Sequence, residues 1–328
     1  MIATSSRASV SKSASLFVMS DRSWRTLARR DLGVATTMSD AIAGGVNLHE
    51  STVGQLRSAS RLFLMSDIGG DHKAATHRAH AFLITDADSV ARWTALWSPV
   101  RRRFLADGRR MSYERLSDQR RRAALDGYLR AADALHGFLI TVLIDKRLQL
   151  FTGGPPPGEF QRWKLEPFRR LLAASHLASI LLAGLSASGQ DVLWISDEDD
   201  FAANEARLWD LCDVFGRVSS HYVQHALGHF RFATSKSDDG SKQIEDLLAL
   251  PDLAAGWLCD LLGAYRRNFA VLSEHVVLPP PSTLRGKSRQ LMAWCAKGTG
   301  SLKHVAVTVE SNEPQSLFLV RRLRFSVG

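Results

Sequence analysis

The chain has 328 residues and carries 42 Lys and Arg against 33 Asp and Glu, which gives a net charge of +9 at pH 7. Hydrophobic residues make up 45% of the sequence and charged residues 23%, so the composition excludes an intrinsically disordered polymer and suits a large folded domain. The basic excess favours a polyanionic partner, nucleic acid above all, although abundant arginine alone would give the same balance.

Cysteine usage and hydropathy indicate a reducing, cytoplasmic setting. The three cysteines, Cys212, Cys259 and Cys295, are far apart and form no CxxC pair, so neither a disulfide framework nor a zinc knuckle is predicted. The longest apolar run, residues 171–185, contains a histidine and two serines and is shorter than the roughly 20 residues that a bilayer span needs. We expect it to form a buried helix and expect no membrane segment.

The two ends of the chain differ from its middle. Residues 1–58 begin with a serine- and arginine-rich stretch, and we predict a loosely organised basic N-terminal arm. Residues 59–277 are predicted to form the main domain. The proline cluster at 278–282 opens a C-terminal extension, 278–328, that ends in a predicted strand pair. An unpaired terminal strand or the arm could contact a protein partner, which defines one function class, a scaffold.

The first half of the predicted domain alternates strands and helices. We predict strands at 61–66, 79–86, 109–117 and 137–145 from short apolar or alternating runs. A helix follows the second strand and is kinked or split by Pro99. Asp118 is placed to cap the next helix, which extends to about Leu135.

The second half continues the alternation. Glycines and prolines predict a loop at 151–160, after which we expect a helix at 161–185 and strands at 190–196 and 229–235. An acidic start predicts a helix after the first of these strands, and Pro251 is expected to be the first residue of another. This order predicts an α/β domain with a mixed sheet flanked by helices.

Carboxylates follow the predicted strands. Asp67, Asp145 and Asp197 each come directly after an apolar run. Ligands gather where strand ends meet loops, and two unit charges at 4 Å repel by about 4 kcal/mol at an effective dielectric of 20. A cluster of such acids therefore requires a divalent cation, and oxygen ligands suit Mg²⁺ or Mn²⁺. The alternative is that these acids only form turns and helix caps.

Four short motifs resemble a known family. They are "SDIGG" after the first strand, "SYERL" in the third, "VLWISDEDD" at 192–200 and "LLALPDLAAG" at 247–256. In these features the chain resembles the bacterial domain-of-unknown-function family 3800, which is assigned to the ribonuclease H-like superfamily. The resemblance extends from about Arg61 to about Arg267 and implies a ribonuclease H-like fold.

The resemblance also implies a site and an activity. Superfamily enzymes use acidic residues to hold two divalent ions and hydrolyse nucleic acid strands, and the matching positions here are Asp67, Glu114, Asp197 and Asp252. Asp145 competes with Asp197 for one of these roles, and Asp197 fits the family order better. The sequence departs from the family pattern at Ile68, where a glutamate is usual, and at Leu248 and Pro251 in the closing signature.

Basic residues near the acids suggest where a polyanion would bind. Arg109, Arg110, Lys236 and Lys242 could line a phosphate track or lie on solvated helix faces. We also expect the histidine-containing stretch 72–80 to be a solvated loop, although one histidine could shuttle protons. The function predicted is a metal-dependent nuclease. The alternative, favoured by Ile68, is a nucleic-acid-binding or defence-complex subunit with a decayed active site.

Overall fold

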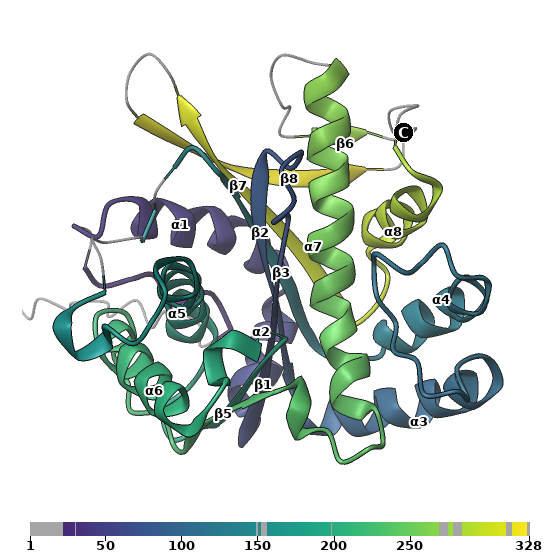
Figure 1. Cartoon of the computed structure of the whole chain (residues 1–328), viewed down its shortest axis with the longest axis horizontal. Coiled ribbons are helices and arrows are strands. Elements are labelled where there is room, and N and C mark those ends of the chain that lie inside the picture. The colour runs from purple at the N-terminus through teal and green to yellow at the C-terminus, as the bar shows by residue number, and fades with distance from the viewer. Residues whose placement is uncertain are drawn as a thin grey trace, which may run out of the picture.

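The structure is a computed structural model that describes residues 22–29, 31–148, 150–151, 156–197, 199–268, 275–277, 284–312 and 317–326. A mixed β-sheet crosses the molecule and helices cover both of its faces (Figure 1). This three-layer arrangement confirms the predicted α/β class. The long helix α7 lies in front of the sheet in Figure 1, with α3, α4 and α8 to its right and α1, α5 and α6 to its left.

Within the described residues the sheet has eight strands, in the order β5-β4-β1-β2-β3-β7-β8-β6. Their bounds are β1 (Arg61–Gly69), β2 (His77–Asp86), β3 (Gly137–Asp145), β4 (Asp191–Ser196), β5 (Phe230–Thr234), β6 (His275–Val277), β7 (Leu302–Asn312) and β8 (Leu317–Ser326). β2 is antiparallel to both β1 and β3, whereas β4 is parallel to β1 and β7 is parallel to β3. β1, β3 and β4 therefore run in the same direction, and their carboxyl ends lie at the same end of the sheet.

Two apolar layers hold the helices against the sheet. One layer joins the sheet to α3 (Ala87–Phe104), α4 (Gln119–Ala132), α7 (Gln243–Asn268) and α8 (Gly286–Lys297). The other joins it to α1 (Val34–Val46), α2 (Glu50–Ser58), α5 (Leu165–Leu185) and α6 (Glu205–Ser219). All nine residues of β3 are buried, as the continuous β-branched run predicts for a strand covered on both faces.

The two longest apolar helices lie in the core. By length and composition α5 and α7 could each cross a membrane, yet 78% and 72% of their apolar windows are buried inside the chain. The expected buried helix at 171–185 is part of α5. Burial of this kind is what a core helix of a globular domain shows.

The N-terminal region differs from the predicted loose arm. Residues 1–21 lie outside the described part, but α1 and α2 are regular helices packed on the sheet. Trp24 is only 1% exposed, and its Nε1 donates a hydrogen bond of 3.0 Å to Ser39 Oγ. The serine- and arginine-rich composition that predicted a loose arm is mainly that of residues 1–21, which lie outside the described part.

The predicted strand at 109–117 is wrong, because this segment is an irregular connection between α3 and α4. The N–H of Tyr113 donates to Asp252 Oδ2 at 2.9 Å, not to a neighbouring strand. Asp118 does cap α4, since its Oδ1 accepts the N–H of Arg121 at 3.0 Å. Pro99 lies inside α3, so it does not split that helix.

The predicted helix start at Pro251 is also wrong, because α7 begins at Gln243. A proline inside a helix removes a backbone hydrogen bond, and the extensive burial of α7 outweighs that loss. The C-terminal extension is continuous with the sheet, since β7 pairs with β3. The terminal strand β8 is paired on both sides, with β7 and β6, and is therefore not an open edge in the described structure.

Candidate active site

The four carboxylates that the family resemblance singles out line one pocket of about 530 Å³. Asp67 comes from β1 and Asp197 directly follows β4, the parallel neighbour of β1. Asp252 comes from α7, and Glu114 comes from the connection between α3 and α4. We call this cavity the acidic pocket.

Strand geometry places the first two acids side by side. The N–H of Asp197 donates to the carbonyl of Ser66 at 3.0 Å, which continues the ladder between β1 and β4. Side chains alternate along a strand, so Asp67 lies on the same face of β1 as Met65. Met65 packs in the layer that contains α7, and Asp67 is therefore directed toward that helix.

Two glycines explain how α7 approaches so closely. A Cβ on Gly69 would lie 2.9 Å from the Cβ of Ala255, so α7 packs directly on the end of β1. Gly70 has φ +85°, a conformation that side chains disfavour, and a Cβ there would meet the carbonyl oxygen of His77 at 2.4 Å. The pair after Asp67 thus turns the chain sharply and brings Asp252 beside the strand ends.

A fixed positive charge lies among these acids. Arg110 Nη1 donates to Asp197 Oδ1 at 2.9 Å. Burial acts to lower the pKa of Arg110, but the bond to Asp197 and the charges of Asp252 and Asp67 outweigh it and raise the pKa above its usual value. Arg110 is therefore the internal counterion of the acidic pocket.

The carboxyl group of Asp252 is perturbed by its burial. Burial raises its pKa to about 6, against the opposing effects of the Tyr113 N–H and of the Arg110 charge. Loss of hydration disfavours the charged form of a carboxyl group. A cation bound beside Asp252 would supply the stabilisation that water does not.

The start of α8 and the middle of α7 complete the wall of the pocket. Lys287 Nζ donates to the carbonyl of Tyr113 at 2.6 Å and lies 3.8 Å from the centre of its ring. Asp260 accepts hydrogen bonds from the hydroxyls of Tyr113 and Ser288, and Arg285 Nε lies 3.3 Å from its Oδ2. Arg285 and Lys287 thus join the site from the predicted extension.

Local sequence patterns did not identify these wall residues. Asp260 follows Asp252 by eight residues, a spacing that returns to the same helix face, so the pattern could have identified it. Arg285 and Lys287 carried no local signal, because they stand in a segment that was predicted to lie outside the domain.

The pocket has an excess of negative charge. Its lining contains six carboxylates against three permanent cations, namely Asp67, Asp71, Glu114, Asp197, Asp252 and Asp260 against Arg110, Arg285 and Lys287. Carboxylate oxygens are the ligands that Mg²⁺ and Mn²⁺ prefer. Within the described residues, however, no three His, Cys, Asp or Glu side chains are close enough together to hold a metal ion.

The pocket offers no thiolate nucleophile. Cys259 lines it, but burial raises the pKa of this thiol to about 12. A thiol with such a pKa stays protonated at neutral pH and is inert. His72 also lines the pocket, on an exposed part of the connection between β1 and β2.

Of the four basic residues predicted to contact nucleic acid, Arg110 alone lines the acidic pocket. Arg109 forms ion pairs with Asp107 at 2.6 Å and with Asp118 at 2.8 Å. Lys242 pairs with Glu245 at 2.8 Å, and Lys236 is exposed just before α7.

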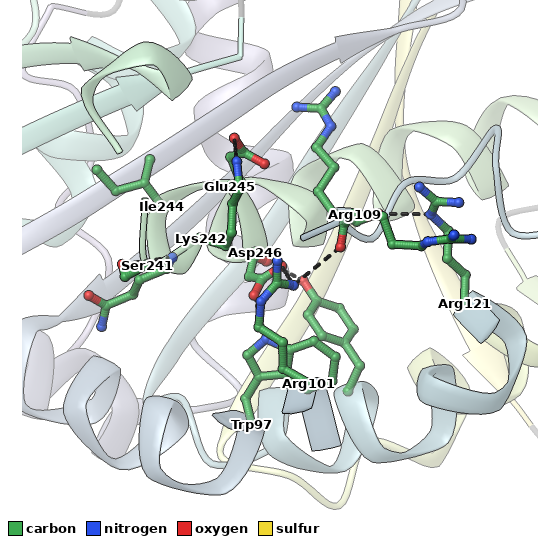
Figure 2. Close-up of polar contacts among 12 residues, drawn as sticks. Trp97, Arg101, Arg109, Arg121, Ser241, Lys242, Ile244, Glu245 and Asp246 are labelled. Carbon is green, nitrogen blue, oxygen red and sulfur yellow. Dashed lines mark hydrogen bonds and ion pairs between the residues drawn. The ribbon is translucent and has the colours of Figure 1, made fainter. Parts of the chain in front are cut away.

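A buried network lies between Arg109 and Lys242. Figure 2 shows Arg101 bridging the carbonyl of Arg109 and the carboxylate of Asp246, at 3.4 Å and 2.8 Å. Trp97 Nε1 donates to the same carboxylate at 2.6 Å. This network holds the beginning of α7 against the connection between α3 and α4, which contains Arg110.

Asp145, the competitor of Asp197, lies apart from the acidic pocket. Its carboxylate pairs with Arg147 at 2.6 Å and lies 3.9 Å from Arg266 of α7, and the residue borders a different cavity. Burial acts to raise its pKa, but the bonds to Arg147 hold the pKa below its ordinary value. The geometry thus groups Asp197, and not Asp145, with the other three acids.

The comparisons with known proteins give no further identification: the chain matches no protein-family model, and a search of curated proteins finds no match to it.

Proposed function

We propose that the chain is a divalent-metal-dependent nuclease with a ribonuclease H-like sheet. The observation that carries this proposal is the convergence of Asp67, Glu114, Asp197 and Asp252 on one pocket from four separate segments. A mixed sheet flanked by helices, with two of the acids at adjacent parallel strand ends, supports the proposed fold.

The chemistry of the donor set fits Mg²⁺ or Mn²⁺. Asp67 and Asp197 would hold the ions, and Asp252 and Glu114 would complete the set of ligands. The excess of three negative charges in the pocket and the raised pKa of Asp252 both favour cation binding. When bound, such ions would supply activation of a water and stabilisation of the leaving oxygen of a phosphodiester.

The basic residues of the pocket are suited to the substrate. Lys287 and Arg285 line the acidic pocket, where they can bind the phosphate of a nucleic acid strand. Tyr113 positions Lys287 through its carbonyl and its ring. Arg110 can exchange its contact with Asp197 for a contact with the phosphate once a metal ion neutralises the carboxylates.

A cleavage assay tests the proposal. The full chain would be incubated with labelled single- and double-stranded DNA, RNA and an RNA–DNA hybrid, in Mn²⁺, in Mg²⁺ and in EDTA. We expect metal-dependent cutting that is lost in Asp67→Asn. The matched control is Asp191→Asn, a carboxylate at the opposite end of β4 that should leave cutting intact. Cutting that persists in EDTA or in Asp67→Asn would exclude the proposed site.

A second candidate function is nucleic-acid binding without catalysis. The contact between Arg110 and Asp197 favours it, because a guanidinium already neutralises part of the acidic pocket. Ile68 at the position of the usual glutamate also favours it. This candidate predicts no cutting in any metal, together with binding whose affinity falls steeply with salt concentration.

A further inference from the structure

A second cavity, of about 340 Å³, lies on the face of the sheet that α5 covers. Its polar lining consists of Arg78 and His80 from β2, Asp145 and Lys146 at the end of β3, and Glu166 and Arg169 from α5. The carboxylate of Asp145 is paired with Arg147 at 2.6 Å. We call it the basic cavity. Its volume is near the lower end of the range of about 300–1,000 Å³ that small-molecule sites occupy.

Three permanent cations converge on the basic cavity from three separate segments. Arg78, Lys146 and Arg169 all line it. Burial lowers the pKa of Lys146, and the neighbouring charge of Arg78 contributes to the shift. Burial also lowers the pKa of His80, to about 3, with smaller contributions from Arg78 and Arg170. The cavity therefore has a positive potential that suits an anion.

Two buried nitrogen atoms at the cavity lack partners. His80 is 2% exposed, and its Nδ1 has no hydrogen-bond partner within the described residues. The Nε of Arg169 is likewise buried and has no partner there. A buried polar atom without a partner costs about 1–3 kcal/mol, so these atoms mark a place for a ligand acceptor. Neutral His80 can donate from Nδ1 in one of its two tautomers.

The carboxylate that now faces these cations is weakly held. The side chain of Glu166 is 58% exposed, and its oxygens lie 3.4 Å from Arg169 and 3.7 Å from Arg78. Exposed pairs at such distances contribute little to stability. Glu166 also lies in the first turn of α5, a helix that begins without a side-chain cap and so presents its positive end here.

One wall of the basic cavity is apolar. Ile144, Leu148, Leu150 and Ala173 contribute this apolar lining. An inorganic anion alone would leave this wall uncovered, whereas a nucleoside carries a planar base that can lie against it. Asp71 links the two sites, since it lines the acidic pocket and forms ion pairs with Arg78 at 3.2 Å and Arg170 at 2.7 Å.

We propose that the basic cavity binds a nucleoside monophosphate unit, with its phosphate between Arg78 and Arg169 in the position that Glu166 now approaches. The unit is either a free nucleotide or the phosphorylated end of a strand. The second source rests on the proposed nuclease function. A nucleic acid strand would then bind with its phosphorylated end in the basic cavity and its scissile bond in the acidic pocket, on the two sides of the connection between β1 and β2. Arg169 is a binding residue in this proposal and takes no part in bond cleavage.

Calorimetry in EDTA tests this site under conditions in which no divalent ion is bound in the acidic pocket. The probes are inorganic phosphate, adenosine 5′-monophosphate, and a short oligonucleotide with and without a terminal phosphate. We expect adenosine monophosphate to bind at least tenfold more tightly than phosphate. Arg169→Gln should weaken that binding about tenfold, and Glu166→Gln should strengthen it about threefold, since like-charge repulsion is removed.

The controls separate this site from the acidic pocket. Asp67→Asn should leave nucleotide binding unchanged, as should Arg130→Gln, an exposed arginine of α4. A preference for the phosphorylated oligonucleotide identifies a strand end as the ligand, and equal binding of both oligonucleotides identifies the free nucleotide. Absence of nucleotide binding, or unchanged affinity in Arg169→Gln, overturns the proposal even where Asp67-dependent cutting is observed. Nucleotide binding without any cutting supports the proposed nucleotide site and contradicts the proposed nuclease function.

Discussion

Arg110 Nη1 lies 2.9 Å from Asp197 Oδ1, so a guanidinium contacts one of the proposed metal ligands. A fixed charge this close competes with a divalent ion for the same carboxylates. We predict that Arg110→Gln binds Mn²⁺ about tenfold more tightly than the natural chain, because unit charges at such distances interact by a few kcal/mol before solvent screening. Calorimetric titration with Mn²⁺ in the absence of nucleic acid measures this change.

Arg285→Gln is the matched control, because Arg285 lines the same pocket but pairs with Asp260. It should change the Mn²⁺ affinity much less than Arg110→Gln does. Equal affinities for Mn²⁺ in the natural chain and in Arg110→Gln would show that Arg110 does not share ligands with the ion.

Gly256 sets the shape of the acidic pocket. A Cβ at this position of α7 would lie 2.2 Å from the ring of Tyr113, so Gly256→Ala must displace the ring or the helix. Alanine ordinarily stabilises a helix by about 1 kcal/mol over glycine, but overpacking costs about 1–3 kcal/mol and should prevail. We predict net destabilisation and weaker metal binding, measured by urea unfolding and by Mn²⁺ titration.

Gly216 provides the contrasting case within another helix. Nothing lies within 4 Å of a Cβ placed there in α6, so Gly216→Ala should stabilise the chain by about 0.5–1 kcal/mol. Destabilisation by both substitutions to a similar degree would mean that contact with Tyr113 is not the cause.

The sequence predicted strands well where a run was both apolar and locally bounded. The strand predicted at 137–145 coincides with β3, because its burial on both faces requires a continuous apolar run. The segment 109–117 was predicted as a strand because apolar and polar residues alternate along it. It pairs with no strand in the described structure, and the N–H of Tyr113 donates to Asp252 instead. Periodicity reports how side chains are buried and not which partner the backbone finds.

Two acids of the site were predictable from a local signal, whereas Glu114 and Asp252 were named through the family resemblance, and the strand and the helix start predicted around them are wrong. Asp67 and Asp197 end apolar strands, and parallel pairing then places them together. The contribution of Lys287 could not be predicted, since it depends on α8 folding back against Tyr113 from 174 residues away along the chain. Contacts between distant segments depend on the packing of the whole chain, and a short stretch of sequence does not predict them.

Trp24 anchors the N-terminal segment to the core. Its ring lies where a Cβ on Gly184 would be, at 2.4 Å, and it is almost fully buried. We predict that Trp24→Ala destabilises the chain by about 3–5 kcal/mol, the usual cost of removing a buried aromatic side chain. The free energy of unfolding in urea measures this effect.

Trp209 is the matched control for Trp24, because it is 68% exposed. Trp209→Ala should change the free energy of unfolding by no more than about 0.5 kcal/mol. A small loss in Trp24→Ala would instead support a loosely attached N-terminal region.

Asp246 makes stability depend on pH. Burial raises its pKa to about 7, and the charges of Glu245 and Asp238 add to this, while Trp97 and Arg101 oppose it. The ordinary value is 3.8, so between about pH 4 and pH 7 the folded chain keeps a proton that the unfolded chain has lost. The contribution of Asp246 to stability therefore falls as pH rises through this interval, by up to about 1.4 kcal/mol per unit.

Asp246→Asn removes this titration while keeping the size of the side chain to which Trp97 and Arg101 donate hydrogen bonds (Figure 2). Urea unfolding at pH 5, 6, 7 and 8 should show the natural chain losing stability relative to this variant as pH rises to about 7. Asp118→Asn gives the opposite sign, because the bond from the Arg121 N–H holds the pKa of Asp118 below its ordinary value. Asp118→Asn is therefore expected to change the free energy of unfolding least at acidic pH. Parallel pH profiles of the natural chain and Asp246→Asn would show that Asp246 is already ionised in the fold, with Arg101 as its permanent partner.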